Sequence, residues 1–458
     1  MWTRFAWMVA LLALVSMGFL IACNAKYSSN DNGLVVVPSQ GGGPLVNNQQ
    51  NGPVMETFSL DLSNGSTTEI NNVNGPPTPG LPTAIVLDPA GNNAYVIVTE
   101  NPAVPGGSVT GIAAFPIASD GKLASATTYT LNNASVTAVV NGQNTVESVP
   151  VTPVALRIDS AGKLLFVANN STSDSSGNPV PGSISVFSVG SNGTLSEVAG
   201  SPFVLPVNGV NVNPPAPCTN QVACSSPLAL AVTPTIYAPQ FAYCSGTAPP
   251  TTENLYVPDS VNNILLNYSV SSNGTLTLVQ TDDGVGIPTG TNPDGVAVDP
   301  CNRFVYASNG GPGSIANTVS AYAICSTVSP PNCPGPAPDF RLLAVKGSPF
   351  AVSPGDSPGP LTVDAYGNYL YVVDIASGLV SQFRISTATG ALTPLVPPFV
   401  SAGIGANSIA IRSDDSFVFV ANMQAATLSE FAVNLQNGNL TPLPVIQTFN
   451  YPSGVAVK

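Results

Sequence analysis

The residue types that this chain lacks set the first limit on its chemistry. It has no histidine, and both of its tryptophans, Trp2 and Trp7, lie close to the N-terminus. Without histidine the chain cannot form a Ser-His-Asp triad, a Cys-His pair or an imidazole metal site. Its cysteines do not have the spacing of a zinc site either. We therefore expect no bound metal and no cofactor.

Arg157 is the candidate catalytic residue. It lies in a short strand motif that recurs along the chain, and the equivalent positions hold Val, Ala or Thr. A guanidinium among small side chains near a channel could bind a carboxylate or polarise a carbonyl oxygen. The alternative is a structural arginine, paired with a neighbouring aspartate or with backbone carbonyls. An arginine–carboxylate pair open to a channel would favour an enzyme, whereas a channel plugged by apolar side chains would favour a binding role.

A second candidate site consists of polar residues that each end an aromatic, β-branched strand: Asn169, Asp259, Asn309, Asp374 and Asn422. In a ring of repeats these residues would lie near one mouth of the channel. They could hold a cation or a hydroxylated ligand, because oxygen ligands suit Ca²⁺. The alternative is that each side chain caps the turn that follows it. The recurrence favours caps, since structural roles repeat in every unit and ligand sites usually do not.

A repeated strand pattern positions these residues. The last copy, Pro452-Ser-Gly-Val-Ala-Val457, matches the first strand of internal units at 82–87, 153–158, 227–232, 293–298, 359–363 and 407–411. The most N-terminal unit, at 34–37, 54–62 and 67–70, has the other strands but lacks this one. If the C-terminal strand completes that unit, the repeats close into a ring without an exposed edge. The sequence therefore predicts an all-β fold: a seven-bladed β-propeller with four-stranded antiparallel blades.

Turns and loops fit the same architecture. Pairs such as Asn192-Gly193 and Asp120-Gly121 suit tight hairpins, because both central residues need a positive φ. Long loops are expected at 132–152, 170–182, 204–226, 235–253 and 325–339. The first three would crowd one face of the ring, here called the first face, around the second to fourth blades. Both ends of the ring would emerge on the opposite, second face.

The strand motif in Leu165-Phe-Val-Ala-Asn169 and Leu370-Tyr-Val-Val-Asp374 resembles that of the lactonase-type seven-bladed propellers. That family includes 6-phosphogluconolactonase and the YVTN-repeat surface proteins. Gly-Ser-Pro-Phe segments at 200–203 and 347–350 add to the resemblance, which covers residues 34–458. It implies the propeller fold and, for the family's enzymes, lactone opening by Arg, His and Glu around the channel. Because this chain has no histidine, we can map no family catalytic residue onto it.

The N-terminus has the pattern of an export signal. Arg4 precedes an apolar run, Phe5–Ile21, and Leu20-Ile21-Ala22-Cys23 ends this region. It resembles a bacterial lipoprotein signal, which implies cleavage before Cys23 and acylation of that residue. The alternative is a transmembrane anchor, for which the run is slightly short.

Three parts are therefore expected: a signal peptide at 1–22, a lipidated tether at 23–33 and the propeller at 34–458. Asn24 resembles the sorting state of outer-membrane lipoproteins, so a cell-envelope location in the outer membrane is favoured over the inner membrane. The net charge is −13, or −14 without the signal. This charge argues against nucleic acid as a partner and against docking on anionic lipid. The membrane contact would be made by the lipid on Cys23.

The remaining cysteines predict disulfides. Of the 7 cysteines, six follow Cys23, and an even number in an exported protein suggests three disulfides. The repeat map favours the pairs Cys218–Cys224, Cys244–Cys301 and Cys325–Cys333. The first and third close local loops, and the second joins equivalent connections of adjacent blades.

For function, the sequence favours a monomeric binding or scaffold module that contacts a protein or glycan through the first face, turned away from the membrane. One alternative is a lactone hydrolase that uses channel residues on an unphosphorylated lactone. Phosphorylated sugar lactones are disfavoured because basic residues are scarce. A structural surface component is the other alternative.

Overall fold

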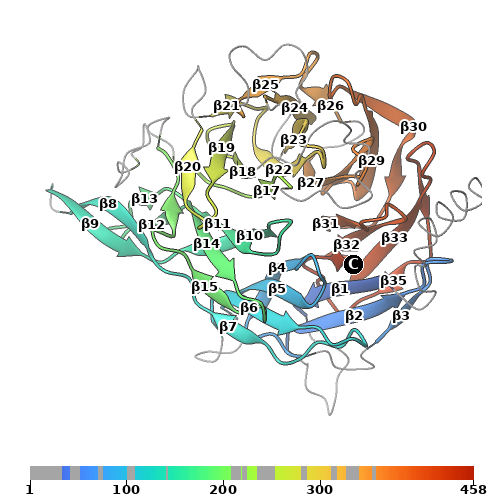
Figure 1. Ribbon diagram of the computed structural model, residues 1–458, viewed down its shortest axis with the longest axis horizontal. Coiled ribbons are helices and arrows are strands. Elements are labelled where there is room, and N and C mark those ends of the chain that lie inside the picture. Colours follow the sequence, from blue (N-terminus) through green and yellow to red (C-terminus); the bar gives the residue numbers. More distant parts are fainter. Residues whose placement is uncertain are drawn as a thin grey trace, which may run out of the picture.

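The computed structural model shows seven small antiparallel sheets around a central axis (Figure 1). It describes residues 33–41, 52–70, 76–100, 109–140, 143–207, 218, 224–234, 253–279, 286–310, 317–325, 340–352 and 357–458. Every regular element in these residues is a strand, and no helix among them could span a membrane. The predicted all-β, seven-bladed propeller is confirmed. The signal peptide and Cys23 lie outside the described residues and stay predictions.

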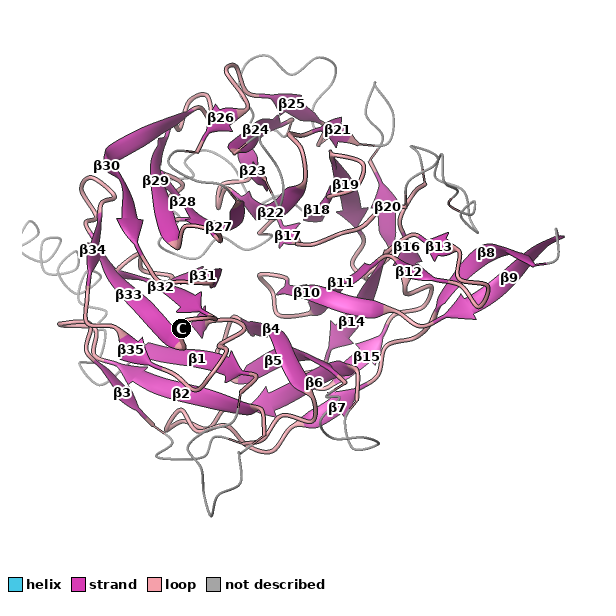
Figure 2. Cartoon of the chain, turned by 180° about the vertical axis from the view of Figure 1, so that it is seen from behind, coloured by secondary structure: helices cyan, strands magenta, loops and turns pink. Residues whose placement is uncertain are grey.

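Each blade runs from an inner strand at the axis to an outer strand at the rim (Figure 2). Blade 1 consists of β36 (Ala456–Val457), β1 (Gly33–Ser39), β2 (Val54–Leu60) and β3 (Thr67–Glu69). Blade 2 consists of β4 (Leu81–Leu87), β5 (Asn93–Thr99), β6 (Gly111–Pro116) and β7 (Thr127–Tyr129). Blade 3 consists of β10 (Thr152–Ile158), β11 (Leu164–Asn170), β14 (Ser183–Val189) and β15 (Leu195–Glu197).

The other four blades follow the same order, from the inner strand outward. Blade 4 consists of β17 (Ala231–Val232), β18 (Glu253–Asp259), β19 (Ile264–Val270) and β20 (Leu276–Leu278). Blade 5 consists of β22 (Pro293–Val298), β23 (Phe304–Asn309), β24 (Thr318–Ile324) and β25 (Leu342–Ala344). Blade 6 consists of β27 (Pro358–Val363), β28 (Tyr369–Asp374), β29 (Leu379–Ile385) and β30 (Leu392–Ser401), and blade 7 of β31 (Ala406–Ile411), β32 (Phe417–Asn422), β33 (Thr427–Val433) and β34 (Leu440–Pro442).

Short additional strands complete the sheets. After the outer strand, a segment returns to pair with the third strand in blades 3, 4, 5 and 7, forming β16 (Phe203–Val204), β21 (Ile287–Pro288), β26 (Phe350–Ala351) and β35 (Ile446–Gln447). In blades 3 and 5 this return is the Gly-Ser-Pro-Phe segment. The hydroxyl of its serine accepts a hydrogen bond from a third-strand N–H, at Val186 or Ala321.

The ring closes as the repeat pattern predicts. Strand β36 pairs with β1 in antiparallel register, with Val457 opposite Val35 and Ala456 opposite Val36. The N–H of Lys458 donates to the carbonyl of Leu34 at 2.9 Å, so the C-terminal end lies beside the start of β1. Because β36 covers the inner edge of β1, the last residues of the chain complete the sheet of blade 1 and protect that edge.

Turn glycines also hold neighbouring blades together. In three blades a buried second-strand tyrosine donates its hydroxyl hydrogen bond to the glycine carbonyl in the outer hairpin of the next blade: Tyr95 to Gly193, Tyr306 to Gly390 and Tyr371 to Gly438. A Cβ on Gly438 would lie 2.2 Å from the ring of Tyr369, so no larger residue fits there. In the described part of the chain, Tyr256 has no such hydroxyl partner. In blade 5, the next blade, a longer cysteine-containing segment replaces this turn in the sequence.

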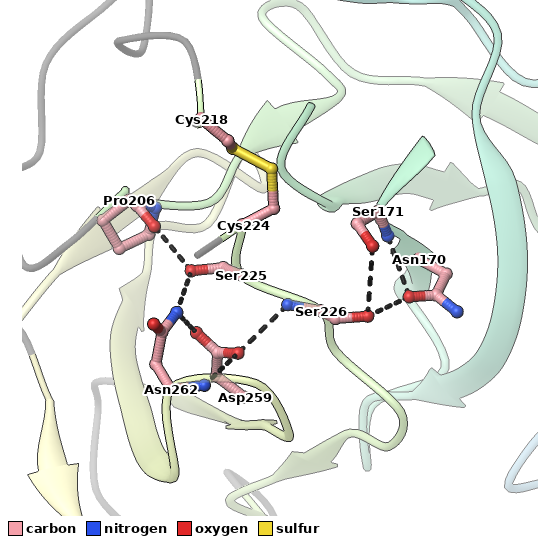
Figure 3. The surroundings of a disulfide bond; sticks show 9 residues. All are labelled: Asn170, Ser171, Pro206, Cys218, Cys224, Ser225, Ser226, Asp259 and Asn262. Carbon is pink, nitrogen blue, oxygen red and sulfur yellow. Dashed lines mark hydrogen bonds between the residues drawn. A yellow bond between two sulfur atoms is a disulfide. The ribbon is translucent and has the colours of Figure 1, made fainter. Parts of the chain in front are cut away.

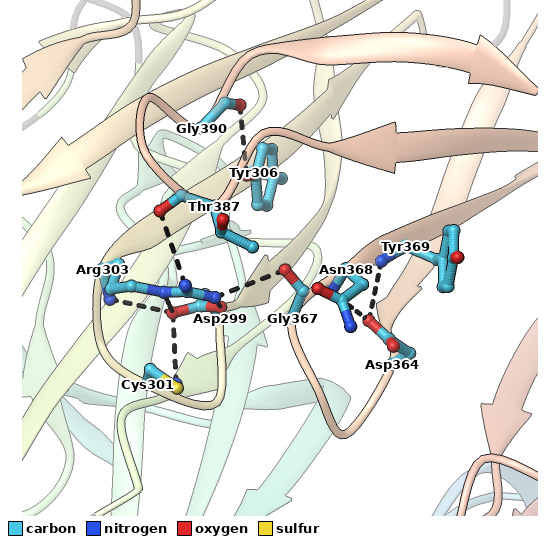
Figure 4. Close-up of polar contacts among 10 residues, drawn as sticks. All are labelled: Asp299, Cys301, Arg303, Tyr306, Asp364, Gly367, Asn368, Tyr369, Thr387 and Gly390. Atoms are coloured by element: carbon cyan, nitrogen blue, oxygen red, sulfur yellow. Dashed lines mark hydrogen bonds and ion pairs between the residues drawn. The ribbon is translucent and has the colours of Figure 1, made fainter. Parts of the chain in front are cut away.

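Blades 5 and 6 are joined on the second face by Arg303 (Figure 4). Its guanidinium forms two hydrogen bonds with the buried Asp299 carboxylate, at 2.9 and 2.7 Å. It also donates to the backbone carbonyls of Gly367 at 3.3 Å and Thr387 at 3.5 Å, both in blade 6. The arginine therefore fixes the first turn of blade 5 against two turns of its neighbour.

Two segments expected to be loops contain hairpins. Strands β8 (Ala134–Val140) and β9 (Gln143–Val149) form an arm that extends beyond the ring in both views (Figures 1 and 2). Strands β12 (Thr172–Ser173) and β13 (Pro179–Val180) form the second hairpin. The base of the arm packs on Val180, and Glu147 accepts hydrogen bonds from the hydroxyl and N–H of Ser175. β-Branched residues on both sides of an Asn-Gly pair are a hairpin signal that the loop prediction missed.

The predicted Cys218–Cys224 disulfide is present, with the two Cα atoms 5.5 Å apart (Figure 3). It leads into Ser225 and Ser226, and the Ser226 N–H donates to the Asp259 carboxylate at 3.0 Å. Cys301 and Cys325 are also disulfide-bonded. Their predicted partners, Cys244 and Cys333, lie outside the described residues, so those two pairings stay predictions.

Candidate active site in the central cavity

A cavity of about 300 Å³ lies on the central axis, lined by the inner strands of the blades. The lining includes small and apolar residues such as Ala155, Leu230 and Ile409. Two of its serines are already engaged: Ser408 accepts a hydrogen bond from the Val455 N–H, and Ser453 donates to a backbone carbonyl. Among the described residues that line the cavity, only Arg157 and Asp294 carry a charge.

The inner strands bulge where they border the cavity. Their pairing with the second strand skips a single residue in blades 2, 3, 5 and 7, namely Thr83, Val154, Asp294 and Asn407. In three of these four blades the residue before the bulge is a proline, which has no N–H to donate to the ladder. A bulge bends the strand and redirects a side chain. In blade 5 the bulged residue is Asp294.

Arg157 lies on β10 of blade 3 and reaches the cavity from there. Its side chain is exposed to the solvent of the cavity, while the surrounding ring lowers the pKa of its guanidinium by desolvation. Within the described residues no ion pair or hydrogen bond joins the guanidinium to another side chain. The partner of a structural arginine is therefore not seen in this part of the chain.

Asp294 is the residue that sequence reasoning missed. It lies on β22, two blades away from Arg157, and is partly exposed in the same cavity. Burial raises the pKa of its carboxyl from 3.8 to about 6. A Cβ on Gly359 would lie 3.3 Å from Asp294 Oδ2, so the glycine of the next blade leaves room for the carboxylate. The sequence did contain a signal for this residue. At its position in the Pro-led motif, the other copies have an uncharged residue: Ser, Thr, Val, Leu, Gly or Asn.

The polar residues at the ends of the second strands are buried and hydrogen-bonded within their blades, so their role as a ligand site stays a prediction. All five are fully buried: Asn169, Asp259, Asn309, Asp374 and Asn422. The asparagines donate to hydroxyls of the third strand, as Asn422 does to Ser429 at 2.9 Å. The aspartates accept from nearby backbone N–H groups, as Asp374 does from Ser377 at 2.8 Å. The aspartate contacts are those of turn caps, as the capping alternative expects, whereas the asparagine contacts join the second strand to the third.

The chemistry of the cavity follows from its two charged groups. Arg157 can stabilise negative charge on a carbonyl oxygen or hold a carboxylate. A carboxyl with a pKa near 6 can accept a proton from water at neutral pH and return it to a leaving group. No cluster of three potential metal-ligating Asp, Glu, His or Cys side chains occurs among the described residues.

The fold resembles that of several solved structures. A candidate 6-phosphogluconolactonase from Bacteroides fragilis is 16% identical and gives a TM-score of 0.60, covering 94% of this chain and 100% of its own. The periplasmic gluconolactonase of Pseudomonas aeruginosa is 17% identical with a TM-score of 0.59, covering 93% and 99%. No family model and no curated protein matches the sequence. The chain thus has the fold of a lactonase-like seven-bladed propeller, and identity this low shows the fold alone.

Proposed function

We propose that this protein is a lactone hydrolase whose active site is the central cavity. The observation that carries the proposal is that an arginine and a carboxylate open into the same cavity. The direct arginine–carboxylate pair named above as a sign of an enzyme is not formed among the described residues, so both groups are left available to a substrate. Burial raises the pKa of Asp294, so keeping this carboxylate ionised without an ion-pair partner costs stability, which is typical of groups retained for function.

In the proposed reaction, Arg157 binds the carbonyl oxygen of the lactone and stabilises the negative charge that develops on it. Asp294 in its ionised form accepts a proton from a water molecule as the water oxygen bonds to the carbonyl carbon. The ring C–O bond then breaks, and the protonated Asp294 returns the proton to the leaving alkoxide oxygen. The product is a hydroxy acid, whose carboxyl group releases a proton to the solvent.

The substrate class is a small, unphosphorylated lactone. The cavity has a volume of about 300 Å³, and Arg157 is its single cation among the described residues. A phosphate carries about two negative charges near pH 7 and is commonly held by several cationic or N–H donors. The names of the similar structures support the reaction type, and the charge of the cavity supports the unphosphorylated substrate.

The test is proton release from a panel of unphosphorylated lactones, measured by pH-stat with the purified mature protein. We expect Arg157→Ala to reduce kcat/KM at least a hundredfold, because loss of one oxyanion donor costs about 10²–10³. Asp294→Asn should reduce kcat by about 10²–10⁴, the range for a general base. Arg384→Ala is the matched control, since that arginine is exposed on the rim, and it should keep full activity. An absence of turnover with folded protein would refute the proposal.

We also propose that the protein is exported and held to the outer membrane by a lipid on Cys23. The close approach of Gly33 to Lys458 on the second face supports a tether on that side and an outward first face. Metabolic labelling with a tritiated fatty acid is the test. Label should enter the wild-type protein and be absent from Cys23→Ala, and equal labelling of both would contradict the anchor.

Binding of a protein or glycan through the first face is a second candidate function, favoured by the β8–β9 arm. The base of the arm packs on the ring, and Val146, further along the arm, is 66% exposed. A photo-crosslinking residue at Val146 should capture a specific partner in intact cells. Leu435 is 62% exposed in the turn between β33 and β34, on the second face, and serves as the control position. Labels at Val146 and at Leu435 that capture the same proteins would count against a role of the arm.

A further inference from the structure

Glu430 is a buried carboxyl without a hydrogen-bonding partner among the described residues, and it lies where blade 7 meets blade 1, an interface here called the seam. It is on β33 of blade 7 and is 2% exposed. Its Oε1 atom is buried and accepts no hydrogen bond. Burial raises the pKa of the carboxyl to about 7. An unsatisfied buried acceptor of this kind lowers the stability of the fold, and lowers it more when it is charged.

The equivalent positions in other blades show that this arrangement is an exception. Glu430 lies opposite the second-strand Phe419, as Gln382 lies opposite Tyr371 in blade 6 and Asn267 opposite Tyr256 in blade 4. Both amides bind the neighbouring blade. The Gln382 Oε1 accepts from the Leu440 N–H at 2.7 Å, and the Asn267 amide donates to the Phe340 carbonyl at 2.8 Å. At the seam, no hydrogen bond joins Glu430 to blade 1 among the described residues.

A pocket of about 260 Å³ occupies the seam instead. Glu430 lines it together with Gly65–Thr67 of blade 1 and Pro444–Ile446 of blade 7. A Cβ on Gly65 would lie 3.3 Å from Glu430 Oε1, so the carboxyl group points towards the blade 1 wall of the pocket. On the other wall, Val445 is 52% exposed and presents an aliphatic surface next to Pro444.

We propose that this pocket binds a primary ammonium group on an aliphatic chain, with the ammonium on the Glu430 carboxylate and the chain along Pro444–Ile446. An ammonium supplies the hydrogen-bond donor that the carboxylate lacks, and its aliphatic stem matches the apolar wall. A bare divalent cation fits less well, because Ca²⁺ takes six to eight oxygen ligands and Glu430 is the sole carboxylate of the described pocket. The site is separate from the central cavity.

Saturation-transfer NMR with hexylammonium and its neutral counterpart, 1-hexanol, tests this proposal on the purified mature protein. Wild type should bind the ammonium at least tenfold more tightly than the alcohol. Glu430→Gln should remove that difference, and Gln382 shows that a blade accepts glutamine at this position. Glu69→Gln is the control for loss of one exposed carboxylate near the seam, and it should leave the discrimination unchanged.

Three results would overturn the proposal. They are equal binding of hexylammonium and hexanol by wild type, discrimination retained in Glu430→Gln, and displacement of hexylammonium by KCl but not by NaCl at equal ionic strength. The last result would mean that the pocket selects a bare metal ion. Thermal unfolding of each variant should be recorded alongside, so that loss of binding is distinguished from loss of the fold.

Discussion

Replacement of Arg303 by methionine tests whether blades 5 and 6 are joined by the ion pair in Figure 4. Methionine keeps an apolar stem and removes the guanidinium. Asp299, whose side chain is fully buried, would then keep only the backbone N–H donors of Cys301 and Arg303. The carbonyls of Gly367 and Thr387 would lose a charged donor from the neighbouring blade.

The expected cost is about 3 kcal/mol. Removing one partner of a buried ion pair typically costs about 3–5 kcal/mol, because the remaining charge is uncompensated. The lower end applies here, since two backbone donors remain on Asp299 and the arginine side chain is 16% exposed. With an unfolding entropy of about 2.1 cal/mol/K per residue, the 458-residue chain should melt about 3 °C lower.

Calorimetry and urea unfolding would measure this cost. The matched control is Arg384→Met, which removes an exposed arginine that stacks on Tyr369 at 5.4 Å and should cost less than 1 kcal/mol. The double variant Arg303→Met, Asp299→Asn should be more stable than Arg303→Met alone, because the unpaired buried charge is gone. Equal costs for the two arginine variants, or a double variant less stable than Arg303→Met, would refute the reasoning.

Three further outcomes follow from the titrating groups and the disulfide. If Asp294 is the base, kcat/KM should rise with pH through about 6 and then level off, and a rate that is independent of pH from 5 to 8 would contradict this role. Serine at both Cys218 and Cys224 should cost about 2.5 kcal/mol in urea unfolding, from the short loop that the bond closes, and an unchanged midpoint would argue against this estimate. Burial raises the pKa values of Glu56 and Glu253 to about 7 and about 8, so the folded state holds protons that the unfolded chain loses near pH 4.5. The free energy of unfolding should therefore fall as the pH rises from 5 to 8, by at most about 1.4 kcal/mol per pH unit for each group. The slope should be smaller in Glu253→Gln. A free energy of unfolding that rises over this range would contradict the raised pKa values.

Strand periodicity was enough to predict the ring. The Pro-led strand recurs once in each unit, and its last copy completes a unit that lacks it, so sequence alone predicted the pairing of β36 with β1. The Cys218–Cys224 pair was predictable for a similar reason, since a short separation leaves few alternatives. Arg157 could be placed near the axis because its repeat position is the inner strand.

The sites themselves depend on contacts between residues far apart in the chain. Asp294 shares a cavity with Arg157 because the inner strand of blade 5 bulges at Asp294 and because Gly359 of blade 6 leaves room for its carboxylate. The β8–β9 arm was predicted as a loop. Its β-branched residues favour strands, but the sequence does not show whether a segment between two blades pairs with itself or lies as a loop on the ring. In the sequence, Glu430 is one polar residue of a strand, and only the contact between blades 7 and 1 shows that it lines a pocket. A period along the chain predicts which strands pair, whereas burial and pKa depend on which side chains meet across blades, and only the folded ring determines those.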